Sequence, residues 1–246
     1  MQNAATASNK WLSIGDWDVS GVKDFSWAFS VDRDVAGGIS SDDLKAGLPF
    51  KSGKNPKAVS FVGASLSKWK TNSATSFAYT FHGAGEMNSD LSGWSVGKVV
   101  TLDKAFSGAS KFAGDGLNSW ITTSLTDLYG TFEGARKMNS NLSGWRVAKV
   151  TTLANMFHGA SKFAGEGLES WDTTSVTTLA RTFEAAYKMD ADLSGWQVDK
   201  VTKMWCTFFV ASKFRYGLTF SFHIHYILHF RGLFLHRHTM RCPQRK

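Results

Sequence analysis

The chain is poor in the residues that cross-link or interrupt small domains. Its 246 residues include only two Cys and three Pro. Two thiols, Cys206 and Cys242, cannot build a disulfide framework or a four-thiolate zinc site. No apolar run approaches the roughly 18 residues of a transmembrane helix, and residues 1–10 lack the basic and apolar segments of a secretory signal. These absences exclude a disulfide scaffold, a zinc finger and a membrane channel, and no transmembrane segment is expected.

Acidic residues are missing from the last part of the chain. The formal net charge is +8, but residues 200–246 hold nine of the 28 Lys and Arg and none of the 20 Asp and Glu. Residues 1–199 therefore carry 19 basic and 20 acidic residues and are close to neutral. Because the basic charge belongs to the tail, no nucleic-acid partner is expected for the body of the chain.

Aromatic residues, in contrast, are abundant, with 10 Trp and 19 Phe. Successive Trp recur every 25 or 26 residues, at Trp69, Trp94, Trp120, Trp145, Trp171 and Trp196. Trp17 stands 52 residues before Trp69, which leaves room for one further repeat. Repeats of this length are typical of solenoids, in which each unit, here called a rung, buries its apolar face only by stacking on its neighbours.

Apolar residues follow the Trp of each rung at fixed distances of five, eight and twelve residues, and an Ala stands fifteen residues on in six of the seven rungs. The residue twelve positions on is always Phe, at Phe29, Phe81, Phe106, Phe132, Phe157, Phe183 and Phe208. This spacing is that of one face of an α-helix. Threonines stand at the expected start of that helix and are predicted to be its N-caps, at Thr75, Thr126, Thr151, Thr177 and Thr202.

The Trp itself lies in an alternating triplet such as Trp145-Arg146-Val147, which is typical of a short half-buried strand. The sequence thus predicts an α/β repeat, a leucine-rich-repeat-like solenoid of about eight 25/26-residue rungs, each a short strand plus a short helix, with the strand side concave. We expect residues 1–10 to be a leader, 11–214 the solenoid and 215–246 a basic, His-rich tail. Residues 30–57 are either a degenerate rung or an insertion of matching length, and in-phase Val35 and Leu48 favour the rung.

The rungs carry a motif that resembles a known family. Residues 17–29, WDVSGVKDFSWAF, are similar to the repeat of BspA-like leucine-rich-repeat surface proteins, also known as a mycoplasma-type, lipoprotein-associated domain of unknown function. LSGW at 142–145 and TTLANMF at 151–157 resemble it too, and the resemblance covers roughly residues 11–214. It implies a leucine-rich-repeat-like solenoid on surface or secreted proteins, used for adhesion or protein contacts, with no catalytic residues. Phe or Leu replaces the family's usual Met eight residues after most Trp.

No catalytic constellation stands out, and the chain is predicted not to be an enzyme. Two columns of acids, Asp115 with Glu166 and Glu133 with Glu184, could serve glycoside hydrolysis. However, one acid in every second rung is more typical of a solvent-exposed face. Two histidines directly follow the rung Phe and are expected to be exposed, namely His82 and His158. Acids occur irregularly in the turns, so no metal site and no cofactor are expected.

An alternative function is that of a polysaccharide-acting β-solenoid enzyme. Such an enzyme should break its repeat symmetry at a cluster of acids. The presumed degenerate rung is the place to look, because it contains Asp32, Asp34, Asp42 and Asp43.

One exposed position is predicted to carry the function. If strand alternation turns each Trp inward, the next residue points outward, and this column reads Asp18, Lys70, Ser95, Ile121, Arg146, Asp172 and Gln197. Its neighbours barely change, yet this column varies from one rung to the next. A column under no selection could drift in the same way. The favoured function is a protein–protein or cell-surface interaction and adhesion module, with a protein or glycan partner of unknown identity.

Basic residues offer a further alternative, a polyanion or membrane-surface binder. Two columns of lysines could bind an anionic glycan or a phosphate backbone, although a role in solubility alone is the favoured interpretation. The columns are Lys98, Lys149 and Lys200, and Lys111, Lys162 and Lys213. The tail could bind through its own charge. Its break with the repeat is typical of a frame change or unspliced sequence in a gene model, and a C-terminal cap or a metal site at His223 and His225 stays open.

Overall fold

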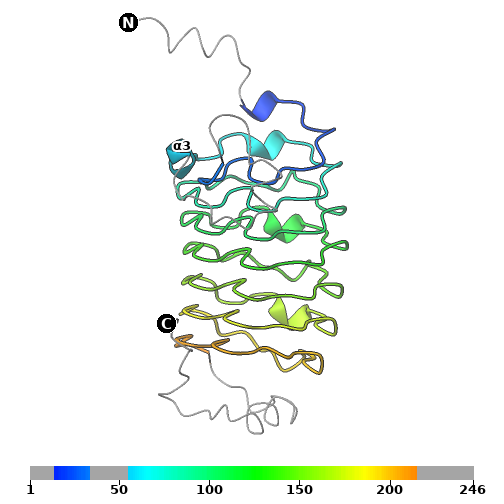
Figure 1. Cartoon of the computed structure of the whole chain (residues 1–246), viewed down its shortest axis with the longest axis vertical. Coiled ribbons are helices and arrows are strands. Elements are labelled where there is room, and N and C mark those ends of the chain that lie inside the picture. The colour runs from blue at the N-terminus through cyan, green and yellow to red at the C-terminus, as the bar shows by residue number, and fades with distance from the viewer. Residues whose placement is uncertain (1–13, 34–54, 215–246) are drawn as a thin grey trace, which may run out of the picture.

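The chain folds into a stack of similar rungs, as Figure 1 shows. The computed structural model describes residues 14–33 and 55–214. Regular helices are few and short: the 3-10 helices η1 (Ile14–Asp16), η2 (Leu66–Lys68), η3 (Leu117–Ser119) and η4 (Leu168–Ser170), and the α-helix α3 (Pro56–Val59). Among the described residues, β pairing is limited to isolated parallel bridges that join each rung to the next: Asp24 to Ser76, Thr101, Asp127, Thr152, Thr178 and Lys203 in turn.

A ladder of backbone hydrogen bonds holds neighbouring rungs together. In the rung of Trp94, the amides of Leu102, Lys104, Phe106 and Gly108 donate to carbonyls of the next rung at 3.1, 2.8, 2.9 and 2.7 Å. The amides between them donate within the rung: those of Ala105 and Ser107 to the carbonyl three positions earlier, at 3.0 and 3.1 Å, and that of Asp103 to the hydroxyl of Thr101 at 3.0 Å. Alternate amides therefore serve the ladder and the local turns, so the backbone is satisfied without a helix or a continuous strand.

This arrangement corrects the predicted rung helix. Within this segment, six of the seven rungs have two residues with a left-handed backbone, for example Lys104 with φ 48° and Gly108 with φ 72°. An α-helix needs an unbroken right-handed backbone, so the segment becomes consecutive turns instead. The second left-handed position is Gly in four rungs, at Gly83, Gly108, Gly134 and Gly159. These glycines were the sequence signal against a helix, because Gly adopts positive φ at little cost.

The threonines predicted as N-caps have a different role. The hydroxyl of Thr126 donates to the carbonyl of Val100 in the preceding rung at 3.1 Å, and its amide donates to the same carbonyl at 2.9 Å. The hydroxyls of Thr75, Thr151, Thr177 and Thr202 likewise donate to preceding-rung carbonyls, at 3.1, 3.4, 3.0 and 3.3 Å. These threonines thus bind rung to rung. The expectation that packed helices would make the strand side concave also loses its basis.

The core is built from columns of stacked rings. The phenylalanine column repeats every 5.4 to 5.7 Å between ring centroids, from Phe29 on Phe81 to Phe183 on Phe208. In alternate rungs a second Phe stacks on it within the same rung, as Phe163 does on Phe157 at 4.0 Å. Stacked rings bury a large apolar area and add a specific ring–ring attraction. A ring column therefore fills the interior along the whole stack.

The tryptophan column does more than fill space. Each indole Nε1 from Trp69 onward donates to the backbone carbonyl three residues before the preceding rung's Trp, as Trp94 does to Leu66 at 2.9 Å. Neighbouring indoles also stack, with Trp120 and Trp145 at 5.9 Å. A Phe could stack in this way but has no donor, which explains why the column is Trp.

The rung of Trp17 pairs directly with the rung of Trp69, which corrects the predicted degenerate rung. Asp24 bridges Ser76, and Phe29 stacks on Phe81 at 5.4 Å. Phe61 then stacks on Phe29 at 4.4 Å, as the second Phe does in alternate rungs. The first rung thus resumes after an insertion, whose residues 34–54 lie outside the described residues, and the described stack has seven rungs and not about eight.

Candidate functional site

All seven residues of the column that follows Trp are exposed. This variable column consists of Asp18, Lys70, Ser95, Ile121, Arg146, Asp172 and Gln197. The residues on either side of these side chains are buried, as Trp145 and Val147 are around Arg146. The first rung is the exception: Trp17 is 48% exposed, so the prediction that each Trp faces inward is wrong there. The alternation predicted from sequence is present, but no strand is assigned at these positions.

Buried threonines fix the backbone beneath three of these side chains. The hydroxyl of Thr122 accepts the amide of Arg146 at 2.6 Å and lies 3.2 Å from its carbonyl, to which it donates. Thr71 and Thr173 hold Ser95 and Gln197 in the same way. One hydroxyl thus replaces two ladder bonds, which keeps the register of the column while the outward side chain is free to differ.

Two acids of the variable column are held in their ionised form. Hydrogen bonds from the side chain and amide of Ser20 lower the pKa of Asp18. Hydrogen bonds from the side chain and amide of Thr174 do the same for the pKa of Asp172. Together with Lys70 and Arg146, the column therefore presents charges of both signs at neutral pH.

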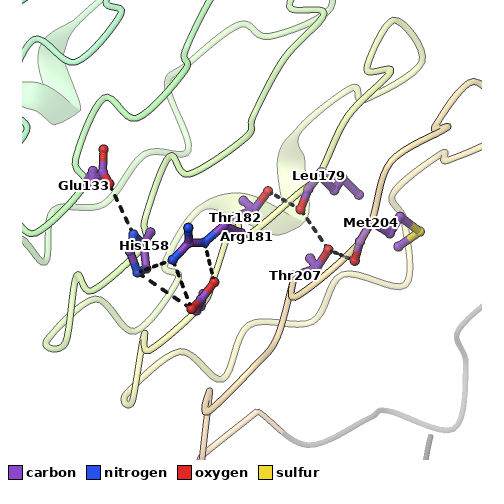
Figure 2. Close-up of polar contacts among 8 residues, drawn as sticks. Glu133, His158, Leu179, Arg181, Thr182, Met204 and Thr207 are labelled. Carbon is purple, nitrogen blue, oxygen red and sulfur yellow. Dashed lines mark hydrogen bonds and ion pairs between the residues drawn. The ribbon is translucent and has the colours of Figure 1, made fainter. Parts of the chain in front are cut away.

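A second group of polar side chains lies beside the ladder (Figure 2). The guanidinium of Arg181 binds both carboxylate oxygens of Glu184, at 2.6 and 3.2 Å. His158 lies between this pair and Glu133, with Nδ1 3.3 Å from the Glu133 carboxylate. Burial alone would raise the pKa of Glu133, but the hydrogen bond from His158 and the charges of Lys104, His158 and Arg181 lower it below its ordinary value. The cluster is a closed network of paired charges that spans three rungs.

This network corrects the expectation of exposed histidines and solvated acids. The side chains of His158 and Glu184 are only 25% and 12% exposed. Arg181 was not among the residues predicted from sequence to be functional. Its position three residues before Glu184 could have indicated that the two side chains form an ion pair. Asp115 and Glu166, in contrast, are exposed as expected. Because the carboxylates of Glu133 and Glu184 are occupied by His158 and Arg181, they do not form an open catalytic pair.

His82 is likewise less exposed than expected. Its Nε2 lies 3.3 Å from the buried carboxylate of Asp32, and burial lowers the pKa of His82 in spite of that charge. The Nδ1 of His82 and the Oδ1 of Asp32 are buried without a hydrogen-bond partner. Of the acids proposed for an enzymatic site, only Asp32 is described; Asp34, Asp42 and Asp43 lie outside the described residues.

Between the two histidines, Lys104 is sandwiched by aromatic rings. Its Nζ lies 5.7 Å from the ring centroid of Tyr79 and 5.6 Å from that of Tyr129. Tyr79 in turn stacks on Trp27 at 3.9 Å. Burial and the neighbouring Asp127 raise the pKa of Asp103 in this region to about 6. The faces of these rings cover one another and Lys104, which is a packing role.

The described residues hold no group of three or more His, Cys, Asp or Glu that could bind a metal ion. Within residues 14–33 and 55–214, no helix has the length and apolar character needed to cross a bilayer. His223 and His225, and the tail as a whole, lie outside these ranges.

Comparison with known proteins identifies the repeat. The model of a family described as "Mycoplasma protein of unknown function, DUF285" matches residues 56–145 and 126–240. No curated protein and no solved structure matches the chain. The two overlapping matches span most of the sequence and include six of the seven Trp-based rungs, so this chain is a member of the DUF285 family.

Proposed function

We propose that the chain is a non-catalytic solenoid of the BspA-like, leucine-rich-repeat-like type that serves as a protein–protein or cell-surface interaction and adhesion module. The observation that carries the proposal is the variable column: seven exposed positions hold six different residue types, on a scaffold whose buried positions repeat almost unchanged. Because the adjoining Trp and Thr restrain the backbone, substitutions in this column change the surface and leave the fold intact.

The binding energy of such a surface comes from many modest contacts along the stack. Arg146 is the expected anchor, because Arg is enriched among interface residues that contribute most to affinity. Ile121, which is 66% exposed, offers an apolar contact beside it. Acids and bases in one column favour a partner of mixed charge, such as a folded protein surface.

The test is affinity capture from the native source with two baits. In the first, Ile121, Arg146, Asp172 and Gln197 are all changed to Ser. In the matched control, four exposed residues of the same chemical types outside the column are changed to Ser: Val100, Lys149, Asp115 and Asn118.

We expect the control to recover the wild-type partner and the first variant to lose it, while both keep the wild-type melting temperature. Equal recovery of every partner by both baits would remove the variable column as the binding surface.

A further inference from the structure

The lysines of five consecutive rungs form one uninterrupted basic column. This lysine column consists of Lys111, Lys137, Lys162, Lys188 and Lys213, each seventeen residues after its Trp. When the chain is divided into units of two rungs, only Lys111, Lys162 and Lys213 align with one another. Lys137 and Lys188 occupy the same position in the two intervening rungs. Every rung from that of Trp94 to that of Trp196 therefore has a lysine at this position.

The backbone keeps these lysines in register over all four intervals. The amide of Asn139 donates to the carbonyl of Ala113, and that of Asp190 to the carbonyl of Ala164, each at 3.0 Å. The hydroxyl of Ser161 donates to the carbonyl of Arg136, and that of Ser212 to the carbonyl of Tyr187, each at 3.4 Å. With a rung spacing of about 4.8 Å, the five lysines span about 19 Å.

The next residue in each rung is a buried Phe or Met, so the lysine before it points to solvent; the buried residues are Phe112, Met138, Phe163, Met189 and Phe214. All five lysines are exposed. Lys111 pairs with Glu86 at 2.9 Å. Among the described residues, no ion pair forms at the other four, and the exposed Asp190, two residues after Lys188, is not within ion-pair distance of it. The four lysines from Lys137 to Lys213 therefore carry positive charge that no ion pair among the described residues neutralises.

We propose that the lysine column binds a linear anionic polysaccharide that lies along the stack. A straight row of cations one rung apart matches a polymer that carries a carboxylate or sulfate on its successive sugar units, since a sugar unit and a rung are similar in length. Single-stranded nucleic acid is disfavoured because its binding sites interleave aromatic rings with basic residues. Of the five residues directly before these lysines, one is aromatic, the exposed Tyr187, and the others are Ser110, Arg136, Ser161 and Ser212.

This inference goes beyond the proposed function, because it assigns a second surface and the chemical class of its partner. The two can be separated: the four-Ser variant of the variable column should bind the polysaccharide as the wild type does. If that variant loses the captured partner but still binds the polysaccharide, the two surfaces act independently, and each proposal is supported by its own experiment.

The experiment compares two charge-matched variants of the full chain. The test variant is K137Q/K162Q/K188Q, and the control is K98Q/K149Q/K200Q, which removes three exposed lysines from another column. Binding to size-fractionated heparin, to oligogalacturonate and to oligo-dT is measured by fluorescence anisotropy over a range of salt concentrations. Both variants should melt as the wild type does.

For both glycans we expect the test variant to lose about tenfold or more in affinity and to show a shallower salt dependence, and the control to lose less than about threefold. A heparin disaccharide should bind far more weakly than an oligosaccharide long enough to span the column. Equal losses in the two variants, or none in either, would overturn the proposal, as charge in general or the tail would then be responsible. Tighter binding of oligo-dT than of both glycans would replace the polysaccharide by nucleic acid.

Discussion

The indole Nε1 of Trp145 donates a hydrogen bond of 2.9 Å to the backbone carbonyl of Leu117 in the preceding rung. Both residues are buried, and the Trp145 ring also stacks on Trp120 at 5.9 Å. The same bond recurs along the tryptophan column, so each Trp joins two rungs by a directional contact as well as by packing. This relationship leads to the first of four stability predictions.

Trp145→Phe should lower the free energy of unfolding by about 2–4 kcal/mol, because it removes ring volume and leaves a buried carbonyl without its side-chain donor. Equilibrium urea denaturation measures this change. The control is Trp205→Phe, at an indole that is 42% exposed, with an expected change below about 0.5 kcal/mol. Equal effects in the two variants would show that the indole bond contributes nothing to stability.

Phe157→Ala should cost about 3–5 kcal/mol, since Phe157 is fully buried and packs on Phe132, Phe163 and Phe183. Because each rung contacts only its neighbours, local unfolding should spread from this point and unfolding should lose cooperativity. Hydrogen exchange would locate the loss of protection, and Phe209→Ala, at a 38% exposed ring, is the control. An unchanged denaturation profile would contradict a core role for the phenylalanine column.

Ala185→Gly should stabilise the chain by about 0.5–1 kcal/mol, although it removes a side chain. Ala185 has φ 56° where four other rungs have Gly, and a Cβ in this conformation is strained. Ala186→Gly, at the buried residue next to it, should destabilise instead. Thermal melts of the two variants test the opposite signs, and destabilisation by Ala185→Gly would rule out backbone strain at that position.

Asp103→Asn should stabilise the chain at neutral pH and leave it unchanged near pH 4. The pKa of Asp103 is raised from 3.8 to about 6, so the folded state binds the proton more tightly than the unfolded state. The cost of ionising Asp103 therefore appears as the pH rises from about 4 to about 6. After allowance for solvent screening, we expect about 1 kcal/mol at pH 7. A stability difference that did not grow over this pH range would mean that the Asp103 pKa is ordinary.

The positions of core and surface could be inferred from the sequence because they depend only on spacing. The Trp and Phe columns, the buried Ala and the exposed residue after each Trp recur at distances that any stacked repeat must respect. The burial of Trp145, the exposure of Arg146 and the burial of Val147 follow from local alternation. No knowledge of the partner rung is needed for that pattern.

The backbone conformation could not be inferred in the same way. Spacings of three and four residues fit an α-helix, but they also fit consecutive turns with left-handed residues such as Lys104 and Gly108, and only hydrogen bonds to the adjacent rung favour the turns. The insertion after the first rung was equally ambiguous, because its length kept Val35 and Leu48 in phase.

Partner choice across rungs was settled by tertiary structure alone. The contact of His158 with Glu133 and that of His82 with Asp32 join residues 25 and 50 positions apart. Sequence by itself determined what each rung repeats. Stacking decided which side chains meet, because a charge becomes paired or unpaired only when the neighbouring rung is in place.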